Sequence, residues 1–454
     1  MAKASVGNPT PTPEPVTLPN LFGLNIQSLS APGQIQPILD AGSDWLRLPG
    51  LRWADVEPAQ GDRNWPAVAG LEADLRRAAE HALTVTLIVQ GTPPWAQKFP
   101  GISCGPMTED TLDDFGNFMY DVVTRYSAAP YHVKIWEIWN EPDVARQLVG
   151  PDSQFGCWGE QQDPTYGGSY YGKMLKIVYP RIKAADPDAQ VLVGGLLLDC
   201  DPNNVCLTSN APRFLEGILA AGGGPFFDGI SFHAYDYYLG GEGQFVNIGW
   251  NTAWDGSGPV LRAKADFIRD RLAHYDASDK LLLNTELALL CDSNCGEFYE
   301  RTKASYVAQS YAAALAAGLT ANVWYDLTGS WRNSGLLFSD GLPRPAYHAF
   351  QFAQQTLDGL AFQETLTQNT GVFGYAFFSD QRRVWLLWSQ DGVSHPVDLP
   401  EMPIAIYDVE GASQTLTRTL TVGLAPRYIT FEVPVTRSHA TSSIQLKNTD
   451  PTDR

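Results

Sequence analysis

The first 360 residues alternate between short apolar segments and amphipathic segments, and the apolar segments number eight. They occupy residues 21–26, 45–50, 83–90, 133–141, 191–198, 229–235, 281–287 and 322–328. Near-continuous apolar runs of this length are typical of strands that are covered on both faces. The segments between them, such as 65–82, 108–126, 170–186, 260–275 and 299–318, have the periodicity of helices. A strand followed by a helix, eight times over, predicts an α/β fold of the (β/α)8 TIM barrel type.

The pattern changes after residues 343–359, which we expect to form the last helix of the barrel. Short alternating runs follow, separated by turn residues; they span 372–378, 383–389, 395–399, 404–409, 415–422 and 427–433. This pattern predicts a small C-terminal all-β sandwich. We therefore expect a catalytic barrel over 20–360 and a sandwich over 361–437. Residues 1–19 are expected to be a Pro/Thr-rich linker or disordered N-terminus, and 438–454 a disordered tail.

The charge of the chain restricts its partners. Asp and Glu number 50 against 31 Lys and Arg, which gives a net charge of -19. Such a charge opposes binding to nucleic acid or to an anionic membrane, and no apolar stretch approaches the roughly 20 residues of a membrane span. The Pro/Thr-rich segment 9–19 is typical of linkers in secreted proteins. We expect a secreted or cell-surface protein whose export signal is absent from this sequence.

Six cysteines are consistent with an exported protein that contains disulfide bonds. Six cysteines allow 15 connectivities; the pairs we expect are Cys200–Cys206, Cys291–Cys295 and Cys104–Cys157, and free thiols are the alternative. Zinc is disfavoured, because neither close pair has paired histidines nearby. The glycine run 222–224 follows a predicted helix and precedes a strand, the reverse of a phosphate-binding loop. No metal or other cofactor is predicted.

Two glutamates, Glu141 and Glu286, lie at the C-terminal ends of the fourth and seventh apolar segments. In a parallel barrel these ends converge on the face where active sites are built. Hydrolysis of a glycoside with retention needs one carboxylic acid to protonate the leaving oxygen and a second, ionised carboxylate, about 5 to 5.5 Å away, to attack the anomeric carbon. The two glutamates therefore predict a glycosidase.

Local motifs around both glutamates resemble those of a known group of enzymes. Trp139-Asn140-Glu141-Pro142 resembles the acid/base signature of clan A glycoside hydrolases, and Thr285-Glu286 resembles the nucleophile at the end of strand seven. The segments 47–65, 92–96 and 139–143 are most similar to family 39, the β-xylosidase group, with family 5 next. The resemblance implies a retaining mechanism with Glu141 as acid/base and Glu286 as nucleophile, and therefore a bell-shaped pH profile.

The resemblance also implies roles for residues near the two glutamates. Asn140 would bind the sugar 2-hydroxyl, and Arg47 would keep the nucleophile ionised; the alternative for Arg47 is a salt bridge with Glu137, on the same strand face as Glu141. His233 and Tyr235 lie two apart and would face the nucleophile and the substrate from strand six. A core histidine is the alternative for His233.

Several aromatic residues are further candidates for substrate binding. By the resemblance, Trp324 would form the floor of the sugar subsite, with core packing as the alternative. Trp95 would line the cleft, although its two prolines alone explain an ordered loop. Four more lie in expected mouth loops, where they either bind sugar or only pack; they are Trp331, Trp158, Tyr237 and Tyr238.

The substrate class remains open at this stage. Exo-acting removal of xylose or glucose from a β-linked carbohydrate is the first hypothesis. An endo-acting β-glycanase and an α-L-arabinofuranosidase are alternatives on the same scaffold, and a non-catalytic carbohydrate-binding barrel is a more distant one. The long segments expected after strands four (143–168), five (199–212) and six (236–258) would suit either a pocket or a groove. The oligomeric state is not predicted.

Overall fold

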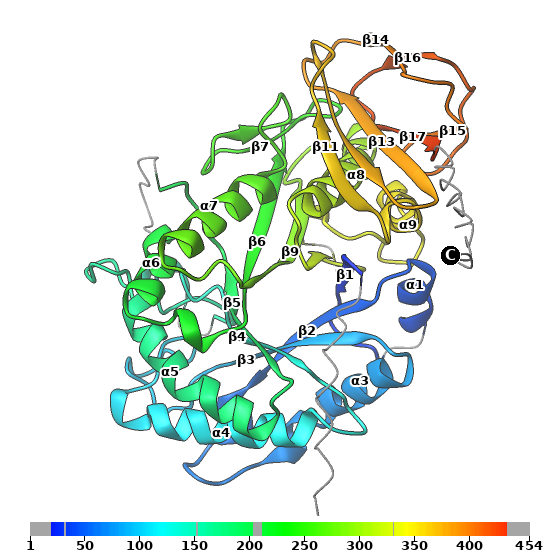
Figure 1. Ribbon diagram of the computed structural model, residues 1–454. Helices are drawn as coiled ribbons and strands as arrows, with labels where there is room; N and C mark the ends of the chain where they lie inside the picture. Colours follow the sequence, from blue (N-terminus) through cyan, green and yellow to red (C-terminus); the bar gives the residue numbers. More distant parts are fainter. Residues whose placement is uncertain (1–19, 31–32, 151–152, 203–210, 330, 434–454) are drawn as a thin grey trace, which may run out of the picture.

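The computed structural model describes residues 20–30, 33–150, 153–202, 211–329 and 331–433 (Figure 1). The predicted N-terminal linker 1–19, the last residues 434–437 of the predicted sandwich and the predicted tail 438–454 lie outside these residues. Within the described part of the chain, no helix is long and apolar enough to cross a bilayer.

A closed barrel of eight parallel strands forms the centre of the molecule, as predicted (Figure 1). Its strands are β1 (Phe22–Asn25), β2 (Trp45–Arg52), β3 (Thr84–Gln90), β4 (Ile135–Asn140), β5 (Gln190–Leu196), β6 (Gly229–Tyr238), β9 (Leu281–Leu290) and β10 (Ala321–Trp324). They are hydrogen-bonded in the order β5-β4-β3-β2-β1-β10-β9-β6, and a pairing of β5 with β6 closes the ring. Each predicted apolar segment overlaps one of these strands, although the segment 322–328 extends beyond β10 and the segments 229–235 and 281–287 end before β6 and β9 do.

Helices surround the barrel, and their apolar faces contact it. They are α1 (Ile35–Asp40), α2 (Trp53–Val56), α3 (Ala69–Glu80), α4 (Leu112–Tyr126), α5 (Gly168–Ala185), α6 (Pro212–Ala220), α7 (Val260–His274), α8 (Glu297–Ala316) and α9 (Pro345–Leu357). In α4 the buried side chains include Phe115, Met119 and Val122, at the three- and four-residue spacing of one helix face. Five 3-10 turns complete the helical part of the described residues.

Strand alternation decides which side chains fill the barrel. Apolar residues at the N-terminal side of the strands form a separate buried cluster inside it; they are Trp45, Ile135, Leu192, Leu283, Ala321 and Val323. Because side chains two apart share a face, Arg47 on β2 and Glu137 on β4 follow this cluster into the interior. The barrel is therefore apolar at its base and charged towards the C-terminal ends of its strands.

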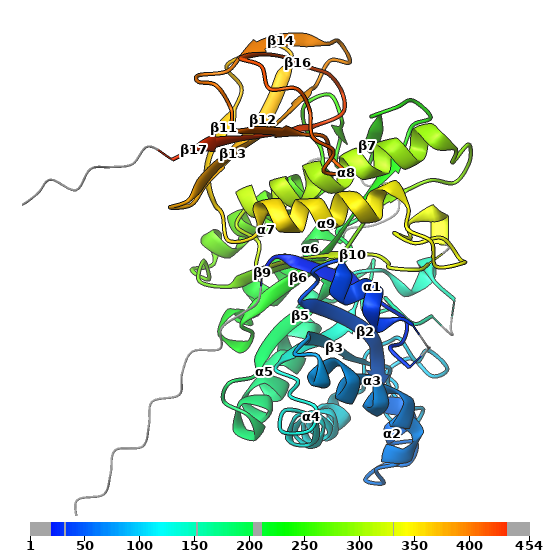
Figure 2. The same cartoon turned by 90° about the vertical axis from the view of Figure 1, so that its right-hand side faces the viewer.

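The C-terminal region is antiparallel, as predicted. One sheet has the order β11-β12-β13-β17-β15, and β14 pairs with β16; the bounds are β11 (Ala361–Leu366), β12 (Val372–Phe378), β13 (Arg382–Ser389), β14 (His395–Asp398), β15 (Ala405–Tyr407), β16 (Thr419–Val422) and β17 (Arg427–Glu432). β11 was not predicted, because four of its six residues are exposed and show no alternation. The region packs on the barrel helices (Figure 2), where Phe352 of α9 contacts Tyr407 and Tyr428.

Two features modify the predicted loops. β6 continues to Tyr238, and a hairpin of β7 (Phe245–Asn247) and β8 (Thr252–Ala253) extends its edge, so residues 236–258 are not one irregular loop. The predicted disulfides Cys104–Cys157 and Cys291–Cys295 are both present. Cys206, of the third predicted pair, lies outside the described residues.

Candidate active site

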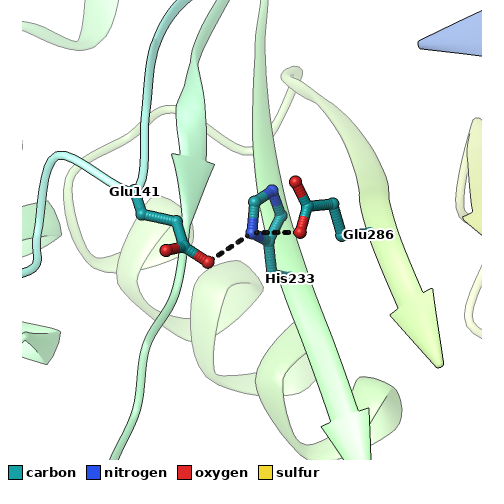
Figure 3. Close-up of side chains that lie close together, drawn as sticks. All are labelled: Glu141, His233 and Glu286. Carbon is teal, nitrogen blue, oxygen red and sulfur yellow. Dashed lines mark hydrogen bonds and ion pairs between the residues drawn. The ribbon is translucent and has the colours of Figure 1, made fainter. Parts of the chain in front are cut away.

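The two glutamates meet at the C-terminal end of the barrel. Glu141 directly follows β4, and its backbone N–H donates to the carbonyl of Gly195 at 2.9 Å. Glu286 lies within β9, and His233 of β6 stands between them (Figure 3). His233 Nδ1 is 2.8 Å from Glu141 Oε1 and 3.4 Å from Glu286 Oε2. One atom from each of the three side chains lies within 4.8 Å of the other two.

Arg47 holds the second glutamate from inside the barrel. Its guanidinium donates to Glu286 Oε1 through Nη1, to both oxygens of Glu137 at 2.7 and 3.0 Å, and to Asn140 Oδ1 at 2.7 Å. The two partners considered for Arg47 from the sequence therefore occur together. Glu137 is fully buried and also accepts a hydrogen bond from the Gly195 N–H at 2.9 Å. The arrangement neutralises a buried cation with two carboxylates.

Burial raises the pKa of both glutamates, but the charged neighbours with the largest effect act on the two in opposite directions. Desolvation raises the pKa of Glu141 well above its usual value, and the negative charges of Glu286 and Asp143 raise it further. Burial also raises the pKa of Glu286, but Arg47 and the hydroxyl of Tyr235 act in the opposite direction. At a pH where only one of the pair is protonated, the proton therefore resides on Glu141.

His233 is fully buried and electrically neutral at neutral pH. Burial lowers the pKa of His233 well below its usual value, and the charges of Arg47 and Lys264 lower it further. Its Nε2 has no hydrogen-bond partner among the described residues. A neutral imidazole with its proton on Nδ1 would direct that proton to the glutamates. The ring fits because residue 195 is glycine; a Cβ there would lie 2.2 Å from Nε2.

Tyr235 contacts the second glutamate directly, on the same strand face as His233. Its hydroxyl donates to Glu286 Oε2, and its own carbonyl accepts from Asn247 Nδ2 at 2.8 Å. Burial and the charges of Glu286 and Glu141 raise the pKa of Tyr235 well above its usual value. It therefore stays protonated and acts as a donor. Both oxygens of Glu286 thus have a donor.

The prediction that Trp324 forms the floor of the sugar subsite is wrong, and the alternative, core packing, holds. Trp324 is 0% exposed, and its indole N–H donates to the carbonyl of Ser334 at 3.0 Å. Ala321 and Val323 belong to the cluster inside the barrel, so Trp324 points to the opposite face of β10 and packs near Tyr306. The next residue, Tyr325, is partly exposed, and its pKa is raised to about 12 by burial and by the charges of Glu286 and Asp326. Tyr325, and not Trp324, faces the carboxylates.

The other aromatic candidates differ in how far they are exposed and in what they contact. Trp158 is buried, and its ring packs against that of Trp139. Trp95 is partly exposed; its ring contacts Trp53, and its indole N–H donates to the carbonyl of Glu57 at 3.0 Å. The remaining three lie nearer the mouth: Tyr237 and Tyr238 are on β6, and Trp331 is in the segment after β10.

Sequence reasoning missed a buried lysine beneath the site. Lys264 of α7 donates to the carbonyls of Leu197 and His233 at 2.6 and 2.8 Å, and burial lowers its pKa to about 8. Asp143, just beyond the acid/base motif, accepts from the N–H groups of Leu197 and Leu198. The helical pattern held a signal, because Val260, Leu261, Lys264 and Ala265 share the buried face of α7.

Glu141, His233 and Glu286 offer the ligand types and the spacing that a divalent cation uses. Arg47 and Tyr235 already donate to the two oxygens of Glu286, and the guanidinium charge would repel a cation. The residues therefore suit proton transfer and attack by a carboxylate better than metal binding.

Comparison with known proteins supports the architecture. No protein-family model and no curated protein matches the sequence. Among solved structures, a family 39 glycoside hydrolase from the gut symbiont Bacteroides cellulosilyticus WH2 is similar, with a TM-score of 0.66 and 22% identity over 90% of this chain and 80% of that one. A family 30 endoxylanase from Clostridium papyrosolvens C71 gives a TM-score of 0.59 at 14% identity over 92% and 97% of the two chains. A family 39 β-xylosidase from Caulobacter crescentus gives 0.56 at 14% over 92% and 98%. The fold of the chain is the one that these enzymes share.

Proposed function

We propose that this chain is a retaining glycoside hydrolase of the clan A type, in which Glu141 is the acid/base and Glu286 the nucleophile. The observation that carries the proposal is the separation of the two carboxyl groups. One oxygen of Glu141 lies within 4.8 Å of one oxygen of Glu286, a close approach that fits the about 5 to 5.5 Å between the carboxyl groups of retaining enzymes better than the roughly 6.5 to 9.5 Å of inverting ones. The similar structures named above support the same class of reaction.

In the proposed mechanism the environment divides the work between the two glutamates. Glu141, whose pKa is held high by burial and by Glu286, donates its proton to the glycosidic oxygen as the bond breaks. Glu286, held by Arg47 and Tyr235, attacks the anomeric carbon and forms a glycosyl ester. Glu141 then takes a proton from water, which attacks the same carbon and releases Glu286. Two displacements retain the anomeric configuration.

The surrounding residues position these groups. Asn140 lies at the end of β4 with its side-chain oxygen on Arg47, which leaves its amide N–H groups for a sugar hydroxyl. His233 donates from Nδ1 between the two glutamates, and Tyr325 takes the place predicted for Trp324 on the inner face. Trp95 stays a candidate for the wall of the cleft.

We further propose a catalytic unit over residues 20–360, a sandwich over 361–437, and export from the cell. The two disulfides support an oxidising compartment. The substrate would be a β-linked carbohydrate. That the enzyme acts at chain ends stays a prediction. That it needs no cofactor and does not bind nucleic acid are predictions as well.

A panel of nitrophenyl glycosides tests the proposal. β-Xyloside, β-glucoside, β-galactoside, β-mannoside and α-arabinofuranoside would be offered to the full chain, and the first-formed sugar anomer followed by NMR. Release of nitrophenol and of a sugar that keeps its anomeric configuration is expected, and Glu286→Gln should release neither product. Inversion at the anomeric carbon would contradict the mechanism. If neither glycosides nor polysaccharides are turned over, the alternative of a non-catalytic carbohydrate-binding protein is favoured.

A further inference from the structure

An exposed surface with two aromatic rings lies beside the proposed nucleophile, and its residues are not those that carry out the proposed reaction. It consists of Tyr237, Trp331, Arg332 and Asp292, which we call the mouth platform. Trp331 is 45% exposed and Tyr237 is 38% exposed. The guanidinium carbon of Arg332 lies 5.5 Å from the ring centre of Tyr237 and 5.7 Å from that of Trp331, and Arg332 Nε lies 3.0 Å from Asp292 Oδ1.

The mouth platform connects to the reacting groups through one layer of rings. The ring centre of Trp331 lies 5.3 Å from that of Tyr235, whose hydroxyl donates to Glu286, and 5.6 Å from that of Tyr325. On β6, Tyr235 and Tyr237 are two residues apart and share a face, so the aromatic surface continues outward from the nucleophile.

The segment that presents Trp331 is held firmly. Arg332 and Asn333 have φ values of +47° and +59°, a left-handed conformation that non-glycine residues keep only where their surroundings impose it. Cys291 supplies these surroundings: its N–H donates to the Arg332 carbonyl at 2.9 Å, and its carbonyl accepts from Asn333 Nδ2 at 3.2 Å. The disulfide to Cys295 fixes Cys291 in turn, and buried Lys303 donates to the Asn333 carbonyl at 3.0 Å. A half-exposed indole in so constrained a segment indicates a binding role.

The chemistry of the mouth platform matches a sugar ring. Exposed aromatic rings stack on the apolar face of a sugar, and a guanidinium paired with a carboxylate offers both donors and acceptors to the equatorial hydroxyls. Because Asp292 already balances the charge of Arg332, the platform suits a neutral sugar.

The side of the platform follows from the positions of the two glutamates. Glu141 must face the leaving group, and it lies across His233 from Glu286 (Figure 3). The hydroxyl of Tyr235 donates to Glu286, and the ring of Trp331 contacts that of Tyr235, so the platform adjoins the nucleophile. We propose that the mouth platform binds a second neutral sugar on the non-reducing side of the sugar being cleaved. This rests on the proposed function, and it replaces the prediction of exo-acting removal of single sugars by cleavage behind a disaccharide or a longer chain.

Paired substrates test this assignment. The probes are nitrophenyl β-xyloside with nitrophenyl β-xylobioside, and nitrophenyl β-glucoside with nitrophenyl β-cellobioside. For the pair that is turned over, Trp331→Ala should lower kcat/KM for the disaccharide glycoside by roughly tenfold, mainly through KM, as expected for the loss of one aromatic contact. The monosaccharide glycoside should change by no more than about twofold, since it does not reach the platform.

Two variants control for structural effects. Trp331→Phe keeps an aromatic ring and should retain most of the activity on the disaccharide glycoside, which a variant that merely disturbed the segment would not do. Tyr120→Ala removes a ring of similar exposure from α4, outside the site, and should leave both substrates unaffected. The melting temperature of each variant would be measured alongside.

Two results would overturn the assignment: equal losses on both substrates in Trp331→Ala, or no loss on either. Turnover of the monosaccharide glycosides without any turnover of the disaccharide glycosides would reject the mouth platform while leaving the proposed function intact. If the wild-type chain cleaves neither these substrates nor any other glycoside of the panel nor a polysaccharide, the proposed function itself fails, and the assignment fails with it.

Discussion

Replacing Glu137 by glutamine tests whether Arg47 is shared between two carboxylates. Glu137 is fully buried, and both of its oxygens accept from the Arg47 guanidinium. Two unit charges about 4 Å apart interact by about 4 kcal/mol at an effective dielectric constant of about 20, and breaking a buried pair costs about 3 to 5 kcal/mol. Glutamine keeps one accepting oxygen, and Glu286 still balances Arg47. We therefore expect Glu137→Gln to lower the free energy of unfolding by about 3 kcal/mol, near the lower limit of this range.

The same substitution should shift the pH dependence of activity in a defined direction. Glu286 must be ionised to attack, and the charge of Glu137 raises the pKa of Glu286. Removing that charge lowers this pKa, so the acid limb of kcat/KM should move to lower pH. The other charged or titratable groups around Glu286 are Arg47, Glu141, Tyr235 and Tyr325, with neutral His233; all are unchanged. We also expect the maximum of kcat/KM to fall by about tenfold, because Arg47 loses one of its anchors.

Glu57→Gln is a matched control for this experiment. Glu57 is also buried, pairs with Arg63 and accepts from the indole N–H of Trp53 at 2.5 Å, but it does not contact Arg47 or the two catalytic candidates. Both variants should lower the melting temperature, by roughly 5 °C for a loss of this size. Only Glu137→Gln should move the acid limb. An acid limb that stays in place, or moves to higher pH, in Glu137→Gln would refute the shared-arginine interpretation.

Three further predictions concern the glutamates and the glycine beside His233. Glu286→Gly should lose turnover by at least roughly 10⁴-fold, and azide or formate should restore it; the absence of any restoration, measured by phenol release, would count against Glu286 as nucleophile. Glu141→Ala should retain activity on dinitrophenyl glycosides, whose leaving group needs no proton, while activity on alkyl glycosides is lost; equal losses on both would contradict an acid role. Gly195→Ala should lower kcat/KM by about 10² with a melting temperature within a few degrees of wild type, because its Cβ would lie 2.2 Å from His233 Nε2 and 2.9 Å from Glu137 Oε1; unchanged kinetics would show that the ring has room to move.

The fold and the central pair were accessible from sequence because their signals are local. Each barrel strand is a nearly continuous apolar run. Glu141 directly follows one of them, β4, and Glu286 lies within another, β9. The error at Trp324 has a different origin. A strand pattern gives the two-residue period but not which set of residues faces inward, and a shift of one residue exchanges the faces. In β10 only contacts with other strands place Val323 inside and Trp324 outside.

Contacts between strands that are distant in the chain could not be predicted from the sequence either, because they depend on how the strands are placed in space. Arg47 was expected to choose between Glu286 and Glu137, whereas the guanidinium reaches both from the barrel interior. Lys264 was passed over because a lysine on a helix normally faces solvent. Its burial depends on carbonyl groups of β6 and of the segment after β5, which lie 31 and 67 residues away along the chain.

The balance of charges in the interior explains how one glutamate can serve as both acid and base. Glu137 and Glu286 contact the Arg47 guanidinium, Lys264 adds a second positive charge that lowers the pKa of Glu141, and His233 is neutral because its pKa is lowered. Arg47 donates to Glu137 and Glu286 but not to Glu141, so the proton that the buried site requires resides on Glu141. Once Glu286 forms an ester its charge is gone, and with it one of the two charges that raise the pKa of Glu141. The pKa then falls, and Glu141, having given up its proton, becomes able to accept one from water.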